Sequence, residues 1–151
     1  MALKVGAKAP AISLHDDQDQ PFKLSSLKGK RVVLYFYPKA DTPGCTKESC
    51  EFRDATAKFG KKDTVVVGIS PDTPAAQAKF KAKFHLPFTL LADADHEVAE
   101  AYGVWKEKSM YGKKYMGVER STFLIDTDGK IEKIFEKVKP EGHALSVLEG
   151  L

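Results

Sequence analysis

The chain has 151 residues, 42% of them hydrophobic and 30% charged, and this balance predicts one folded domain over residues 1–151 rather than a disordered chain. The net charge of +3, from 24 basic and 21 acidic residues, is too small to indicate a nucleic-acid-binding protein. No stretch approaches the roughly 20 apolar residues that span a bilayer. Residues 1–6 lack the apolar core of a secretion signal, so we expect a cytoplasmic protein that binds no membrane.

Three short, continuous apolar runs predict strands that are buried on both faces of a sheet. They lie at residues 32–37, 64–69 and 122–125, and the first is ended by Pro38. Such runs are typical of parallel strands that helices cover on both sides. A shorter strand is expected near residues 88–91.

Helices are expected between these strands. Residues 43–59 have helical character, and a second helix is predicted over residues 74–84 because Thr73 is a good N-cap and a proline follows it. Asp95 is a candidate cap for a third helix over residues 96–102.

The C-terminal part predicts a hairpin and a last helix. Residues 126–129 form a turn, residues 130–138 alternate like an antiparallel strand, and a short helix follows Pro140. A β-α-β start with a terminal hairpin predicts a mixed central β-sheet flanked by helices. The expected fold class is therefore α/β with a thioredoxin-like layout, to which the first thirty residues add an N-terminal β-hairpin.

The only two cysteines, Cys45 and Cys50, lie five residues apart at the start of the first predicted helix. An isolated close pair is typical of a catalytic, redox-sensing or metal-binding site rather than of a disulfide scaffold. With Thr42 as N-cap and Pro43 at the first helical position, Cys45 lies in the first turn. Unpaired N–H groups and the helix dipole favour an anion there, and the anionic thiolate is the nucleophilic form of cysteine.

A thiol at this place needs help to ionise. With a pKa of about 8.5, roughly 3% of a thiol is ionised at pH 7, whereas a pKa of about 6 would ionise roughly 90%. Lys39 and Lys47 favour the thiolate of Cys45. Asp41 and Glu48 oppose it, so a further cation is needed from elsewhere in the chain.

Cys45 and Cys50 cannot form a disulfide within a regular helix. Residues five apart rise about 7.5 Å and differ by about 140° in direction, which places their Cα atoms about 8.6 Å apart. A disulfide needs Cα atoms within about 7 Å. We therefore expect an intact helix with two free thiols in the reduced protein and a locally unfolded segment in the oxidised protein.

The surroundings of Cys45 resemble those in peroxiredoxins. Residues 38–45 match their active-site pattern Pro-x-x-x-Thr-x-x-Cys, and the longer run over residues 42–54 is similar to the bacterioferritin comigratory protein, or peroxiredoxin Q, subfamily. Residues 6–10 and 117–126 extend the resemblance to nearly the whole chain.

The resemblance implies a thiol peroxidase that needs no cofactor and no metal. Cys45 would be oxidised by a hydroperoxide to a sulfenic acid, and Cys50 would resolve it as a disulfide. Thr42 would hydrogen-bond the thiolate and the peroxide, Pro38 would shield the site from water, and Arg120 would supply the missing cation. Thioredoxin or a similar dithiol would reduce the disulfide. Because one chain carries both cysteines, a monomer is expected.

Other functions leave weaker signals. A general thiol–disulfide oxidoreductase is the main alternative, although its usual Cys-x-x-Cys motif is absent. A zinc site needs about four ligands, and the four scattered histidines form no recognisable set with the cysteines. A binding module would use a basic helical face made by Lys79, Lys81 and Lys83, for which solvated lysines are the simpler explanation.

The interpretation of three side chains stays open. Arg120 is either the missing cation or a surface partner of Glu119. Arg53 either packs the first helix or supports the site, and Glu48 is a weaker candidate for the hydrogen-bond network around the thiol.

Overall fold

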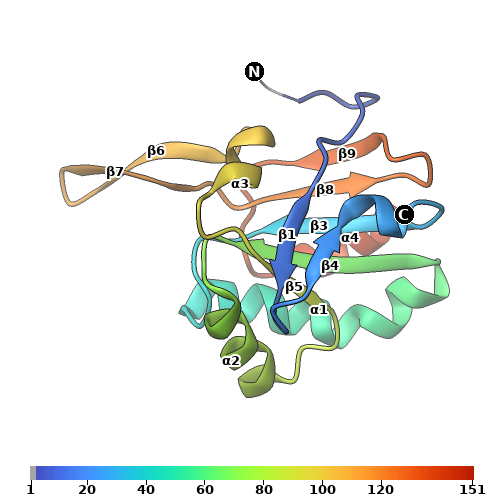
Figure 1. Cartoon of the computed structure of the whole chain (residues 1–151), viewed down its shortest axis with the longest axis horizontal. Coiled ribbons are helices and arrows are strands. Elements are labelled where there is room, and N and C mark those ends of the chain that lie inside the picture. The colour runs from blue at the N-terminus through green and yellow to red at the C-terminus, as the bar shows by residue number, and fades with distance from the viewer. Residues whose placement is uncertain (1–2) are drawn as a thin grey trace.

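The computed structural model describes residues 3–151, which form a seven-stranded sheet, four α-helices and a two-stranded ribbon (Figure 1). Met1 and Ala2 lie outside the described residues. The strands are β1 (Ser13–Asp16), β2 (Pro21–Lys23), β3 (Arg31–Phe36), β4 (Thr64–Ser70), β5 (Thr89–Ala92), β6 (Trp105–Met110), β7 (Lys113–Val118), β8 (Ser121–Ile125) and β9 (Ile131–Phe135). The helices are α1 (Pro43–Lys61), α2 (Pro74–Phe84), α3 (Glu97–Ala101), α4 (His143–Glu149) and a 3-10 turn η1 (Leu24–Leu27).

The central sheet is mixed, as predicted. Its strand order is β2-β1-β5-β4-β3-β8-β9, in which β3 pairs with β4 and β4 with β5 in parallel, and the other neighbours are antiparallel. The predicted N-terminal hairpin is confirmed as β1–β2, and β1 joins it to the sheet by pairing with β5. The thioredoxin-like α/β layout is therefore confirmed.

Strand β3 shows why this sheet needs helices on both faces. Val33 and Tyr35 pack into a cluster with side chains of α1, α2 and α4, whereas Leu34 and Phe36 pack into a second cluster with α3 and the N-terminal segment. All four side chains are essentially inaccessible to solvent. The continuous apolar run is thus explained by two cores, one on each side of the strand.

The start of α2 agrees with the prediction from the sequence, whereas the start of α3 differs from it. Helix α2 has the predicted bounds, and the Thr73 hydroxyl accepts a hydrogen bond from the Ala76 N–H, at 3.2 Å. Helix α3 is shorter than predicted, and Asp95 does not cap it. The carboxylate of Asp93 accepts from the N–H groups of Val98 and Ala99 instead, at 3.1 and 2.9 Å.

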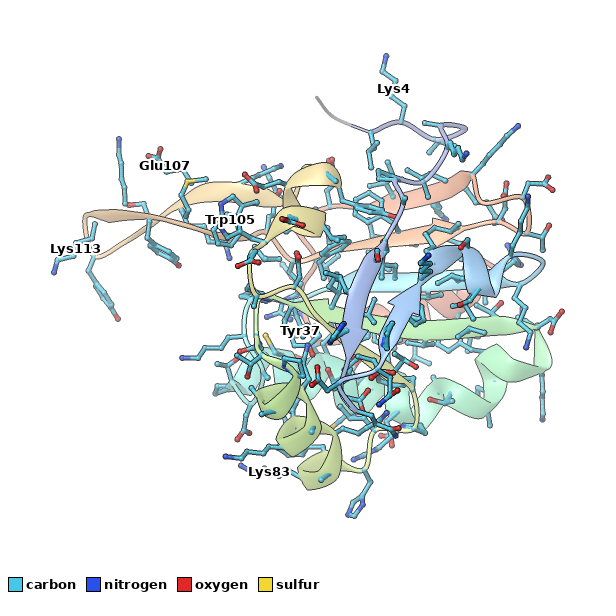
Figure 2. The ribbon with its side chains drawn as sticks, viewed as in Figure 1. Lys4, Tyr37, Lys83, Trp105, Glu107 and Lys113 are labelled. Atoms are coloured by element: carbon cyan, nitrogen blue, oxygen red, sulfur yellow. The ribbon has the colours of Figure 1, made fainter. Side chains whose placement is uncertain are left out.

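The ribbon β6–β7 was not predicted. Its strands pair in antiparallel register around a two-residue turn, where Tyr111 and Gly112 both have positive φ, 53° and 78°. The ribbon projects from the body, and Figure 2 shows Glu107 and Lys113 along it. Its residues are mostly polar and exposed, so the sequence contains no alternating apolar pattern that would predict these strands.

Candidate active site

Cys45 lies where the buried strand β3 gives way to helix α1. It is the third residue of the helix and 1% exposed, while Cys50 is partly buried on the same helix. Both cysteines carry free thiols, and α1 runs without a break over its 19 residues. The expected helix with two free thiols is confirmed, and the unfolding of its first turns on oxidation stays a prediction.

The missing cation is Arg120, which lies 75 residues further along the chain. Antiparallel pairing of β3 with β8 sets Phe36 opposite Ser121, so the residue before β8 lies at the edge of the sheet where β3 ends. The Arg120 Nη2 donates to the Cys45 Sγ at 3.3 Å. The alternative surface pair with Glu119 is not formed, because Glu119 pairs with Lys106 at 2.5 Å.

The same guanidinium holds a second acid. Nη1 of Arg120 donates to Oε1 of Glu48 at 2.7 Å, and Glu48 is 0% exposed. Burial raises the pKa of Glu48 to about 7, although Arg120 acts to lower it. Oε2 of Glu48 has no hydrogen-bond partner among the described residues. The weaker expectation that Glu48 joins this network is therefore confirmed.

Thr42 occupies the predicted N-cap position but does not cap the helix with its side chain. Its backbone is extended, with φ −99° and ψ 155°. Its hydroxyl donates to the carbonyl oxygen of Lys39 at 2.8 Å, and among the described residues it makes no hydrogen bond to the Cys45 sulfur. The hydroxyl proton is thus committed, and the oxygen lone pairs remain available as acceptors.

Gly44 and Pro38 both precede the thiol of Cys45 in sequence. A Cβ on Gly44 would lie 3.1 Å from Nη2 of Arg120 and 3.4 Å from Cγ of Pro140, so the glycine gives the guanidinium room. Sequence reasoning missed this use of Gly44, for which a glycine in the first turn of a helix is the only signal. Pro38 is partly buried between β3 and α1, and its shielding of the sulfur stays a prediction.

Arg53 does not belong to this site. Its Nη1 donates to the carbonyl oxygen of Phe84 and its Nε to Asp54, both at 2.9 Å. It therefore ties α1 to the end of α2, which favours the packing role over the catalytic one.

Two buried side chains beneath α1 were not singled out from the sequence. The hydroxyl of Tyr35 shares a 2.8 Å hydrogen bond with that of Ser49, between the two cysteines. His143 at the start of α4 shares a 2.7 Å hydrogen bond with Thr122, and burial lowers its pKa to about 4, so it is neutral at pH 7. Tyr35 anchors the segment that disulfide formation would have to unfold.

The lysines of α2 are largely neutralised. Lys81 pairs with Asp17 and Lys83 with Asp41, each at 3.0 Å, and this weakens the basic face that a binding module would need. Among residues 3–151, no helix has the length and apolarity to cross a membrane.

Comparisons with known proteins agree with this geometry. Residues 5–134 match the sequence model of the AhpC/TSA family. Peroxiredoxin Bcp of Bacillus subtilis (strain 168) is 50% identical over 151 residues, 100% of this chain and 96% of the relative. Peroxiredoxin Bcp of Escherichia coli (strain K12) is 48% identical over 149 residues, 99% of this chain and 96% of the relative.

Solved structures give the same result. A cysteine-to-serine variant of Xylella fastidiosa PrxQ has a TM-score of 0.94 and 34% identity, over 99% of this chain and 96% of that one. Xanthomonas campestris bacterioferritin comigratory protein has a TM-score of 0.90 and 36% identity, over 97% and 96%. These matches confirm the resemblance seen in the sequence. The chain therefore belongs to the AhpC/TSA family, and it is a peroxiredoxin of the Bcp and peroxiredoxin Q group that acts as a thiol-dependent peroxidase.

Proposed function

We propose that Cys45 is the peroxidatic cysteine and that Cys50 resolves its sulfenic acid as an intramolecular disulfide. The observation that carries this proposal is the 3.3 Å contact between the Arg120 guanidinium and the sulfur of Cys45, a residue that is 1% exposed. A cation at this distance, together with the first-turn N–H groups of α1, stabilises a thiolate. It also stabilises the negative charge that develops on the oxygens as the O–O bond breaks.

Thr42 and Pro38 complete the proposed site. Because the Thr42 hydroxyl already donates to Lys39, its oxygen is free to accept from the O–H of a bound hydroperoxide. This would turn the terminal peroxide oxygen toward the sulfur. Pro38, at the end of β3, would limit the access of water.

The two cysteines also suggest what reduces the enzyme. A disulfide between Cys45 and Cys50 would be opened by thiol exchange with a dithiol, and thioredoxin is the reductant we propose. Alkyl hydroperoxides are proposed as substrates beside hydrogen peroxide, since the Xanthomonas campestris relative is described by its alkyl peroxide reduction activity. We further propose a single domain that works as a monomer in the cytoplasm, without nucleic-acid or membrane partners.

Three proteins test the assignment: the wild type, Cys45→Ser and Cys50→Ser, assayed for peroxide consumption with thioredoxin. We expect no turnover by Cys45→Ser. We expect Cys50→Ser to consume one equivalent of peroxide and then stop, or to turn over only with small thiols. Full thioredoxin-linked activity in Cys45→Ser would overturn the proposal, and faster reduction of a disulfide protein than of hydrogen peroxide by the wild type would favour a general oxidoreductase.

A further inference from the structure

Glu48 is a fully buried acid whose second oxygen has no partner within the described part of the chain. It follows Cys45 by three residues on α1, so both side chains lie on one face of the helix. Oε1 is held by Arg120, whereas Oε2 is buried without a hydrogen bond among the described residues. A buried carboxylate oxygen without a donor is unfavourable, but a protonated carboxyl carries its own donor and loses the charge.

Arg120 is the one cation that contacts both acids within the described part of the chain. Its Nη2 reaches the Cys45 sulfur at 3.3 Å and its Nη1 reaches Glu48 at 2.7 Å. One positive charge balances one negative charge, and the side chains of Arg120 and Glu48 are 15% and 0% exposed. A second anion beside the first is disfavoured both by burial and by like-charge repulsion.

The neighbouring elements do not supply a second compensating contact among residues 3–151. Glu51, on α1, carries a negative charge that further raises the pKa of Glu48. His143, on α4, is neutral because burial lowers its pKa to about 4. Lys108, on β6, faces the same region, and burial together with the Arg120 charge lowers its pKa. Lys108 makes no hydrogen bond to Glu48 or Cys45 in the described structure, so it does not stabilise one of the two anions over the other by direct contact.

We propose that Cys45 and Glu48 share one proton, so that the reactive site is a thiolate beside a neutral carboxylic acid. The other resting form is a thiol beside a carboxylate, and the two forms differ only in the place of the proton. Glu48 acts through Arg120 and is a positioning residue, since its charge decides how strongly the guanidinium attracts the sulfur. This inference rests on the proposed role of Cys45 as the nucleophile.

Sharing a proton also balances the peroxide step. The thiolate attacks the terminal peroxide oxygen, an S–O bond forms, the O–O bond breaks, and an alkoxide or hydroxide leaves and takes up a proton. Sulfur is oxidised to a neutral sulfenic acid and the peroxide is reduced. Arg120 then faces one acid alone, so Glu48 ionises, and the proton that it releases balances the one that the leaving group takes up from water.

The test follows the thiolate absorbance of Cys45 against pH in Cys50→Ser, where only one thiol remains. Coupled acids titrate in two steps, so we expect a biphasic rise in the parent protein. Adding Glu48→Gln keeps an oxygen for Arg120 but fixes the neutral state. We then expect a single step, shifted to lower pH by about one unit, which is a tenfold change in the thiolate-to-thiol ratio.

The direction of this shift separates the proposal from a purely structural role. If Glu48 only held Arg120 in place, the substitution would weaken the cation contact and move thiolate formation to higher pH. An unchanged or upward shift therefore overturns the shared proton. Asp54→Asn is the matched control, since it removes an exposed carboxylate from the same helix, and it should leave the titration unchanged.

A second measurement needs no change at Glu48. In Cys50→Ser, difference infrared spectra before and after one equivalent of peroxide should show the loss of a protonated carboxyl band. No such loss despite stoichiometric oxidation of Cys45 would overturn the shared proton while leaving the peroxidase proposal standing. No oxidation of Cys45 would instead overturn the proposed function itself.

Discussion

Helices α1 and α2 both begin with Thr-Pro, yet their threonine hydroxyls do opposite things. Thr73 accepts from a helix N–H group and caps α2. Thr42 turns away and donates to the Lys39 carbonyl, so its side chain does not cap α1. The difference leaves the first-turn N–H groups of α1 available to the thiolate proposed at Cys45. The same dipeptide therefore caps one helix and, under the proposed function, leaves the start of the other free to bind an anion.

The buried polar side chains near the two helix starts differ in the same sense. Gln77 on α2 is well paired: its amide nitrogen donates to Ser70 and Leu91, each at 2.8 Å, and its oxygen accepts from Tyr37 at 2.6 Å. Glu48 on α1 keeps one oxygen unpaired among the described residues. The buried amide near the start of α2 has all of these hydrogen bonds, whereas the buried carboxyl near the start of α1 has one oxygen without a partner among the described residues.

The largest expected effect comes from exchanging the two threonines for valine. Thr42→Val removes the oxygen that would accept from the peroxide, so we expect the rate constant of Cys45 oxidation to fall about a hundredfold. Thr73→Val removes the cap and should lower the free energy of unfolding by about 1 kcal/mol without changing that rate. Stopped-flow oxidation kinetics and urea unfolding measure both.

The contrast between the two threonines would be contradicted if Thr42→Val and Thr73→Val had the same effects on the oxidation rate of Cys45 and on the free energy of unfolding. Thr42→Ser keeps the hydroxyl and should retain most of the oxidation rate. A fast Thr42→Val enzyme would show that the threonine oxygen has no part in the reaction.

A smaller effect is expected from two glycines of α1. In Gly44→Ala the new methyl group would lie 3.1 Å from Nη2 of Arg120 and displace the guanidinium by a few tenths of an ångström. We expect about a tenfold slower oxidation of Cys45. A methyl group on Gly60 would meet nothing within 4 Å, so Gly60→Ala should raise the free energy of unfolding by about 0.5–1 kcal/mol and leave the rate unchanged. Equal rates in both variants would contradict this use of Gly44.

The smallest effect concerns the two tyrosines that anchor the helices. Tyr35→Phe removes the hydrogen bond to Ser49, which holds α1 closed between the cysteines. A loss of about 1 kcal/mol should speed disulfide formation about fivefold, because α1 must unfold before the sulfurs meet. Tyr37→Phe removes a bond to α2 instead, and disulfide formation should keep its rate. Rapid-quench thiol counting after one equivalent of peroxide distinguishes them.

Much of the fold could be predicted because three strands of the central sheet are buried on both faces. The apolar runs that became β3, β4 and β8 carry a strong local signal, and so do the Thr-Pro pairs at the helix starts. The ribbon β6–β7 lacks that signal, since most of its lysines and both of its tyrosines, Tyr111 and Tyr115, are exposed. Gly112, which follows Tyr111 in a tight turn, was its one available sign.

The site was less accessible to local reasoning. The position of Cys45 in the first turn followed from Thr42 and Pro43, but the hydrogen bond chosen by the Thr42 hydroxyl depends on where the Lys39 carbonyl lies in three dimensions. Arg120 comes from the edge of another strand, and only the family resemblance indicated it.

The prediction that Asp95 caps α3 was wrong, again because the cap depends on the three-dimensional position of a neighbouring segment. Asp95 is nearer in sequence to the helix start, but Asp93 at the end of β5 is held by the sheet in a place from which its carboxylate reaches the first N–H groups. The position of the preceding strand thus determines which of the two acids caps the helix, and the local sequence pattern does not show that position.

Because the register between β3 and β8 is fixed, one part of the site would stay in place during the proposed cycle while another part moves. Arg120 is held next to the sheet, whereas the sulfur would move away and return as the first turns of α1 unfold and refold. Each turnover would thus end in a small folding reaction against a preformed template. Helix formation takes about 0.1–1 μs, whereas enzymes typically turn over about 10 times per second. Refolding of the helix would therefore occupy a negligible share of the catalytic cycle and would not limit the rate of turnover.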